Sequence, residues 1–107
     1  MAITIKSPTP SQLPSSKGTL YTCPASTSAI VKLITLSNTG AAMNAVNLYK
    51  KGSAGTSKHL IGVNTPLGVG QALEFGGVIT LEAGDLIEGD ATNANEVDYT
   101  LSLVERT

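Results

Sequence analysis

The sequence has little of the chemistry that active sites and disulfide frameworks require. Its 107 residues include one cysteine, one histidine, no tryptophan, one phenylalanine and three tyrosines. With Cys23 alone, no disulfide can form within the chain, and a reducing compartment suits it. A nucleophilic mechanism would have to pair Cys23 with His59, and neither residue lies in a signature of such a pair. We therefore predict that the chain is not an enzyme and has no catalytic residues.

Charged residues are also scarce, at 14% of the chain, against about 25% in a typical soluble domain. This deficit predicts that a neighbouring chain covers part of the surface; the alternative is a surface made polar by Ser, Thr, Asn and Gly. No apolar run reaches the roughly 20 residues that a membrane-spanning helix needs. The start, Met1–Lys6, lacks the basic-then-apolar layout of a signal peptide. We expect synthesis in the cytoplasm without export, and no membrane partner.

The charges that are present are divided along the sequence. All eight acidic residues lie at or after Glu74, and six of the seven basic residues lie at or before Lys58. A Greek-key or jelly-roll chain places early and late strands side by side, so the two halves are expected to be neighbours within one sandwich. The N-terminal segment is the exception, because Lys6 and Lys17 are expected to face an acidic surface on another chain.

From Gly18 onward the pattern of apolar residues is that of short strands rather than helices. In the last and clearest strand, apolar side chains alternate with polar ones: Val97, Tyr99, Leu101 and Leu103. Val104 then interrupts the polar face. Residues 30–36 are apolar on both faces except at Lys32, which is typical of a central strand. Further strands are expected at residues 20–22, 46–50, 59–63, 71–75, 78–81 and 85–88.

These strands predict an all-β fold, an antiparallel β-sandwich of jelly-roll or immunoglobulin-like topology. Strand number and spacing do not choose between the two. The sandwich is expected over residues 18–107. Residues 1–17 are rich in Pro and Ser, and their prolines favour an extended conformation outside any central strand. This segment is either a disordered tail or an extended arm that lies on a neighbouring subunit.

An arm of this kind needs apolar anchors. Ile3 and Ile5 stand two residues apart, which suits a short added strand with one face buried. With the nearby leucine and the two lysines, they form the candidate partner-binding set: Ile3, Ile5, Lys6, Leu13 and Lys17.

No motif for a metal ion, a cofactor or a nucleic acid is present. The acidic residues within 85–90 do not have the spacing of a calcium loop. The glycines within 68–73 are followed by neither a third glycine nor a helix, as a phosphate-binding loop requires. The lysines within 50–58, with Tyr49 beside them, form only a modest basic cluster, which is more typical of a solvated hairpin loop than of a nucleic-acid site. We predict no metal, no cofactor and no nucleic-acid partner.

Four stretches carry a resemblance to a known group of proteins: residues 20–31 (LYTCPASTSAIV), 36–39 (LSNT), 81–87 (LEAGDLI) and 99–105 (YTLSLVE). Over residues 18–105 the chain resembles small β-sandwich virion proteins of tailed bacteriophages and prophages. That resemblance implies a structural role on the particle, commonly capsid decoration or cementing, and no catalysis. The Pro/Ser-rich start lies outside the matching region, so the resemblance implies nothing about it.

The expected function is that of a decoration or cement protein, which binds the outside of the shell of a tailed bacteriophage and bridges capsid subunits. Its expected partners are the major capsid protein and copies of itself, as a dimer or trimer set by particle symmetry. Its expected location is the capsid surface of the virion. The alternative is a tail-, collar- or fibre-associated receptor-binding module of the same β-sandwich type.

Overall fold

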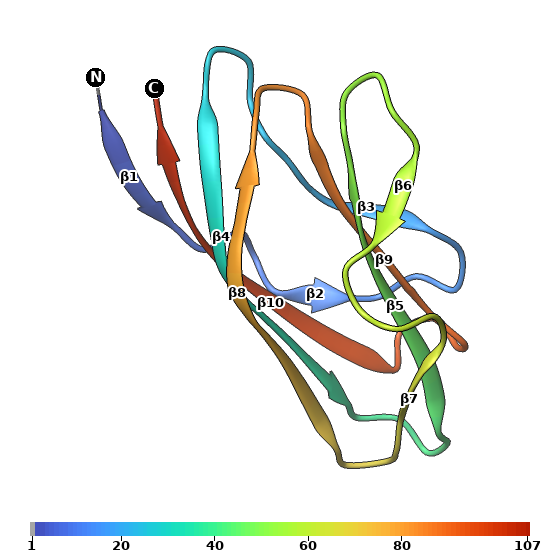
Figure 1. The fold of residues 1–107 in the computed structure, drawn as a ribbon. Coiled ribbons are helices and arrows are strands. Elements are labelled where there is room, and N and C mark those ends of the chain that lie inside the picture. The colour runs from blue at the N-terminus through green and yellow to red at the C-terminus, as the bar shows by residue number, and fades with distance from the viewer. Residues whose placement is uncertain (1) are drawn as a thin grey trace.

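The computed structural model describes residues 2–107 and contains ten strands and no helix within them (Figure 1). The strands are β1 Ile3–Lys6, β2 Ser11–Gln12, β3 Gly18–Thr22, β4 Ser28–Asn38, β5 Asn44–Lys51, β6 Ser57–His59, β7 Thr65–Leu67, β8 Ala72–Leu81, β9 Leu86–Ala91 and β10 Val97–Arg106. The two ends of the chain lie at the same end of the molecule (Figure 1).

The strands form two antiparallel sheets that pack face to face as a sandwich (Figure 1). Sheet A has the order β1-β10-β4-β8, with β2 also on β10; sheet B has the order β3-β9-β5-β6, with β7 also on β5. The strands pair in nested fashion from the two ends of the chain inward. The strands β1 and β2 pair with β10, β3 pairs with β9, β4 pairs with β8, and β5 pairs with β6 and β7. This nested pairing is that of a jelly roll. The predicted all-β antiparallel sandwich is confirmed, with the jelly-roll topology.

The core lies between the two sheets, and β10 shows how the sequence builds it. Val97, Leu101 and Leu103 are buried, whereas Thr100 and Ser102 on the opposite face are exposed. This is the alternation expected for a strand with one face in a core. Because sheet A and sheet B each contribute such a face, apolar side chains fill the interior without any aromatic residue larger than Phe or Tyr.

The central strand β4 contains a bulge, which explains why its sequence is apolar on both faces. In the pairing with β10, Ser102 lies opposite Leu33 while the next residue, Leu103, lies opposite Val31. Lys32 is therefore an extra residue on β4, and the inward-facing positions shift by one beyond it. As a result Val31 and Ile34 are both buried although they stand three residues apart. The predicted central position is confirmed, because β10 and β8 flank β4 on its two edges.

Three of the expected strands differ from the observed ones. The stretches 71–75 and 78–81 belong to one strand, β8, which continues through Gly76 and Gly77. The glycine pair predicted a break between two strands. The strand continues instead, and its pairing with β4 is irregular opposite the bulge of β4. The strand predicted at residues 59–63 is wrong beyond His59. Residues 60–64 instead form a loop that ends with Asn64 in the left-handed conformation (φ 52°).

Candidate partner-binding surface

The two isoleucines of the predicted partner-binding set lie exposed on β1. Ile3 is 68% exposed and Ile5 is 87% exposed. The strand pairs with β10 of the same chain, with Ile3 opposite Arg106 and Ile5 opposite Val104. Both isoleucines point away from the core, so they are accessible to another chain. Their binding to a partner stays a prediction.

The two lysines of the set are exposed, and each also contacts a group of its own chain. Lys6 Nζ lies 3.4 Å from Glu105 Oε1. Glu105 is buried and also accepts a hydrogen bond from the hydroxyl of Tyr21, whose pKa is raised by burial and by this bond. Lys17 Nζ lies 4.5 Å from the ring centroid of Tyr49, within the range of a cation–π contact. Lys6 is thus paired with a late strand of its own chain, and the contact of the two lysines with an acidic surface on another chain stays a prediction.

Leu13, the fifth member of the set, is fully buried in the core of its own chain. Its backbone N–H donates to the carbonyl of Val97 at 2.8 Å, and the carbonyl of Pro14 accepts from the N–H of Ala91 at 2.9 Å. Its side chain packs over Gly89, where an added Cβ would lie 3.0 Å from Leu13 Cδ2. The part of the N-terminal segment that can leave sheet A without uncovering the core is therefore β1, in which no residue is buried.

A row of side chains on the outer face of sheet A continues from β1 across the sheet. The strand registers place Ile5 opposite Val104, Val104 opposite Ile30, and Ile30 opposite Thr80. Neighbouring strands lie about 4.8 Å apart, and side chains directly opposite each other touch. Three apolar side chains and the methyl group of Thr80 therefore form one continuous row across β1, β10, β4 and β8 of sheet A.

A shallow hollow of about 430 Å³ lies at this row. The residues lining it come from all four strands: Ile3, Ser28, Ile30, Thr80, Val104 and Arg106. Its lining is mostly apolar, and Arg106 is the one charged residue in it. The hollow thus suits an apolar side chain with a negative group beside it.

The sequence carried a signal for this row. Val104 interrupts the polar face of the last strand, and Ile30 makes its strand apolar on the outer face too. These two residues are 74 positions apart, and only the pairing of β4 with β10 brings them opposite each other. The sequence did not predict the row, because no local pattern shows that Val104 pairs with Ile30.

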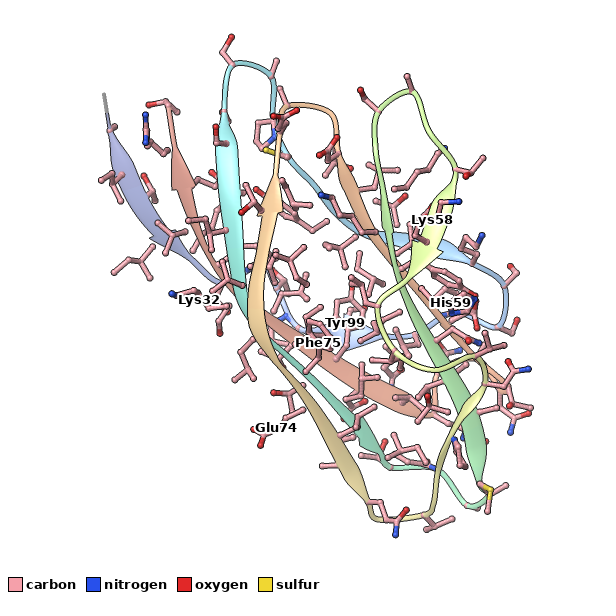
Figure 2. The ribbon with its side chains drawn as sticks, in the orientation of Figure 1. Lys32, Lys58, His59, Glu74, Phe75 and Tyr99 are labelled. Atoms are coloured by element: carbon pink, nitrogen blue, oxygen red, sulfur yellow. The ribbon has the colours of Figure 1, made fainter. Side chains whose placement is uncertain are left out.

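The thiol and the imidazole lie in different parts of the fold. Cys23 is buried after β3, where its thiol donates to the carbonyl of Thr27 at 3.3 Å and burial raises its pKa. His59 lies on β6 in sheet B, with its ring centroid 4.6 Å from that of Tyr49 (Figure 2). Within residues 2–107 no group of three or more His, Cys, Asp or Glu side chains could hold a metal ion. The described part of the chain also contains no helix that could span a membrane.

A polar cluster on the outer face of sheet B has a structural role. Tyr49 donates its hydroxyl to Asp90 Oδ2 at 2.6 Å, and Asn47 Nδ2 donates to Asp90 Oδ1 at 2.8 Å. Asn47 also exchanges two hydrogen bonds with Asn64, which fastens the loop of residues 60–64 to the sheet. Burial, followed by the bond to Asp90, raises the pKa of Tyr49 to about 12. Each carboxylate oxygen of Asp90 is already paired, so the cluster offers no open position for a ligand.

The fold has similar solved structures. Over 98% of its length the chain aligns with a chain of the acidic stable capsid structure of Helicobacter pylori bacteriophage KHP30, with a TM-score of 0.56, 13% identity and 87% of that chain covered. A chain of infectious bursal disease virus Gt strain aligns with a TM-score of 0.42 and 13% identity, and the present chain spans 30% of it. No protein-family model and no curated protein matches the sequence. The first likeness, at this identity, shows the fold: a small two-sheet jelly roll.

Proposed function

We propose that this chain is a structural virion protein of a tailed bacteriophage, which binds the outside of the capsid shell and cements its subunits. The observation that carries the proposal is the likeness, over 98% of this chain and 87% of the other, to a chain of a bacteriophage capsid structure. Both chains are thus single jelly rolls of similar length. The resemblance of four stretches of the sequence to small phage virion proteins supports the same role.

The physical properties of the domain suit a cementing role. A cement protein must fold by itself, be rigid, and bind the assembled shell more tightly than its separated subunits. The jelly roll supplies a closed apolar core, and among residues 2–107 every buried side-chain nitrogen and oxygen atom has a hydrogen-bond partner. Copies placed by the symmetry of the particle, as dimers or trimers, act together, so a modest affinity per copy is sufficient.

The proposal predicts that shells lacking this protein are less stable and that adding it restores them. Binding to the intact shell alone stabilises it by about 2.7 kcal/mol per site at a concentration 100 times the Kd. The measurement is the disruption temperature of particles from a phage in which this gene is inactivated, with and without purified protein. We expect the temperature to rise and to saturate at a fixed ratio of protein to shell subunit. No binding, or an unchanged disruption temperature at saturation, would contradict a cementing role; serum albumin serves as the control addition.

A further inference from the structure

The exposed large apolar side chains of residues 2–107 are concentrated on one part of the surface. Seven are exposed, and three of these lie in loops: Met43, Val63 and Val69. The other four lie on one half of the outer face of sheet A: Ile3, Ile5, Ile30 and Val78. With the half-buried Val104 between them, these four form what is here termed the sheet A patch. A contiguous exposed apolar patch on a small soluble domain marks an interaction site.

Around the sheet A patch the cations Arg106 and Lys32 outnumber the one neighbouring carboxylate, that of Glu82. Arg106 lines its hollow, and Lys32 follows Ile30 by two residues on the same face of β4. Both side chains are exposed, and neither takes part in an ion pair; the ion pair found among residues 2–107 joins Lys6 to Glu105. Glu105 points into the sandwich, so it does not neutralise the patch from outside.

Asp98 and Glu74 of the same outer face lie toward its other end, whereas the exposed Glu82 follows Thr80 by two residues, beside the hollow. Asp98 stands six residues before Val104 on β10, roughly 20 Å away along the strand. It is also hydrogen-bonded to Gln12. Glu74 lies on β8 beyond the glycine pair, and Figure 2 shows it farther along the face than Lys32. A partner seated on the patch therefore meets apolar side chains and the cations Arg106 and Lys32, with Glu82 as the carboxylate nearest to the hollow.

This charge distribution argues against a second copy as the occupant. In a two-fold dimer the same patch would face itself. The patch carries more positive than negative charge, so two copies face to face would bring net charge of the same sign together, which is destabilising where water is excluded. The complementary surface is one that presents carboxylates beside apolar side chains.

Building on the proposed function, we propose that the sheet A patch is the shell-docking surface of this protein. The partner is a segment of the shell protein in which an apolar side chain enters the hollow and a neighbouring carboxylate reaches Arg106. Ile3 and Ile5 contribute from β1, so the N-terminal strand acts as part of the surface while it remains paired with its own β10.

Two valines of matched exposure test this assignment. Val78 in the patch is 67% exposed and Val63 in the loop of residues 60–64 is 68% exposed. We expect Val78→Asp to weaken binding to protein-depleted shells at least tenfold, because it places a desolvated carboxylate in the apolar contact. Val63→Asp is expected to bind within a factor of two of the parent. Both variants should unfold within a few degrees of the parent, since neither side chain contributes to the core.

The outcomes separate the surface from the function. If the parent protein does not bind depleted shells, the proposed function fails. If the parent binds and Val78→Asp binds equally well, the function stands and the docking surface is wrong. If Val78→Asp instead turns an oligomer into a monomer in solution while shell binding is unchanged, the occupant is a second copy and the shell assignment is overturned.

Arg106 provides an independent test of the chemistry of the partner. A carboxylate partner makes binding weaker as salt rises, because the ions screen the attraction. We expect Arg106→Gln to bind the depleted shells several-fold more weakly at low salt and to lose most of the salt dependence. An unchanged salt dependence in Arg106→Gln would overturn the assignment of a carboxylate at this position.

Discussion

Replacing Leu13 with alanine is expected to lower the free energy of unfolding by about 3 kcal/mol, within the range for a leucine removed from a closed core. Leu13 is fully buried, and it packs on Gly89 and beside the core strands β9 and β10. For a domain of this size the loss corresponds to a fall in Tm of roughly 12 °C. Urea unfolding and a thermal melt followed by circular dichroism measure both quantities.

Ile5 is the matched control for Leu13, because the two lie in the same N-terminal segment with opposite exposure. Ile5→Ala is expected to change the free energy of unfolding by about 0.5 kcal/mol or less, as for an exposed position. The pair therefore distinguishes a segment that is anchored in its own core at Leu13 from one that is merely attached to the surface. Equal, small effects of the two substitutions would contradict the placement of Leu13 in the core.

Asn38→Ala is expected to cost about 3 kcal/mol, because three backbone groups lose their partner at once. The Asn38 side chain is 1% exposed. Its Nδ2 donates to the carbonyls of Ala42 and Leu67, each at 2.9 Å, and its Oδ1 accepts from the N–H of Gly40 at 3.0 Å. A single amide thus joins the turn after β4 to the end of β7, and no water enters easily to replace it.

Asn93→Ala is the control for the Asn38 substitution. The Asn93 side chain donates one long hydrogen bond, of 3.5 Å, to Glu96. Its loss is expected to cost about 0.5 kcal/mol or less. Chemical unfolding measures the free energy of unfolding of both variants. If Asn38→Ala lowers it no more than Asn93→Ala does, the Asn38 side chain does not hold the turn after β4 to the end of β7.

The strands with a local signal were predictable from the sequence. The alternation from Val97 to Leu103 defines β10, and the apolar residues 30–36 define the centre of sheet A. The jelly-roll topology was not predictable, because it depends on which distant strands pair, and both candidate topologies have the same number and spacing of strands. The pairing of β1 with β10 joins residues about a hundred positions apart.

The predicted partner-binding set shows the same limit at the level of single residues. Leu13 lies between prolines in a segment without a core-forming pattern, so nothing local indicates that its side chain is buried. Ile3 and Ile5 were recognised from their spacing, and they are exposed side by side as that spacing suggests. The remaining members of the sheet A patch come from strands far along the sequence, and only the register of the sheet assembles them.

The division of charge along the sequence also has a structural explanation. In the jelly roll early strands pair with late ones, so β5 with its lysines lies against β9 with Glu88 and Asp90, and Lys6 meets Glu105. The expectation that the two halves are neighbours within one sandwich is confirmed. Around the apolar patch, Arg106 and Lys32 take part in no ion pair within residues 2–107.

The number of copies of this protein in purified particles tests the central claim most directly. Quantitative mass spectrometry against the major capsid protein gives the ratio without any assumption about where the protein binds. A shell-binding structural protein repeats with the symmetry of the capsid, so we predict on the order of hundreds of copies per particle. A single-digit copy number would contradict this account and would indicate a component of the tail, the collar or the fibres at one vertex.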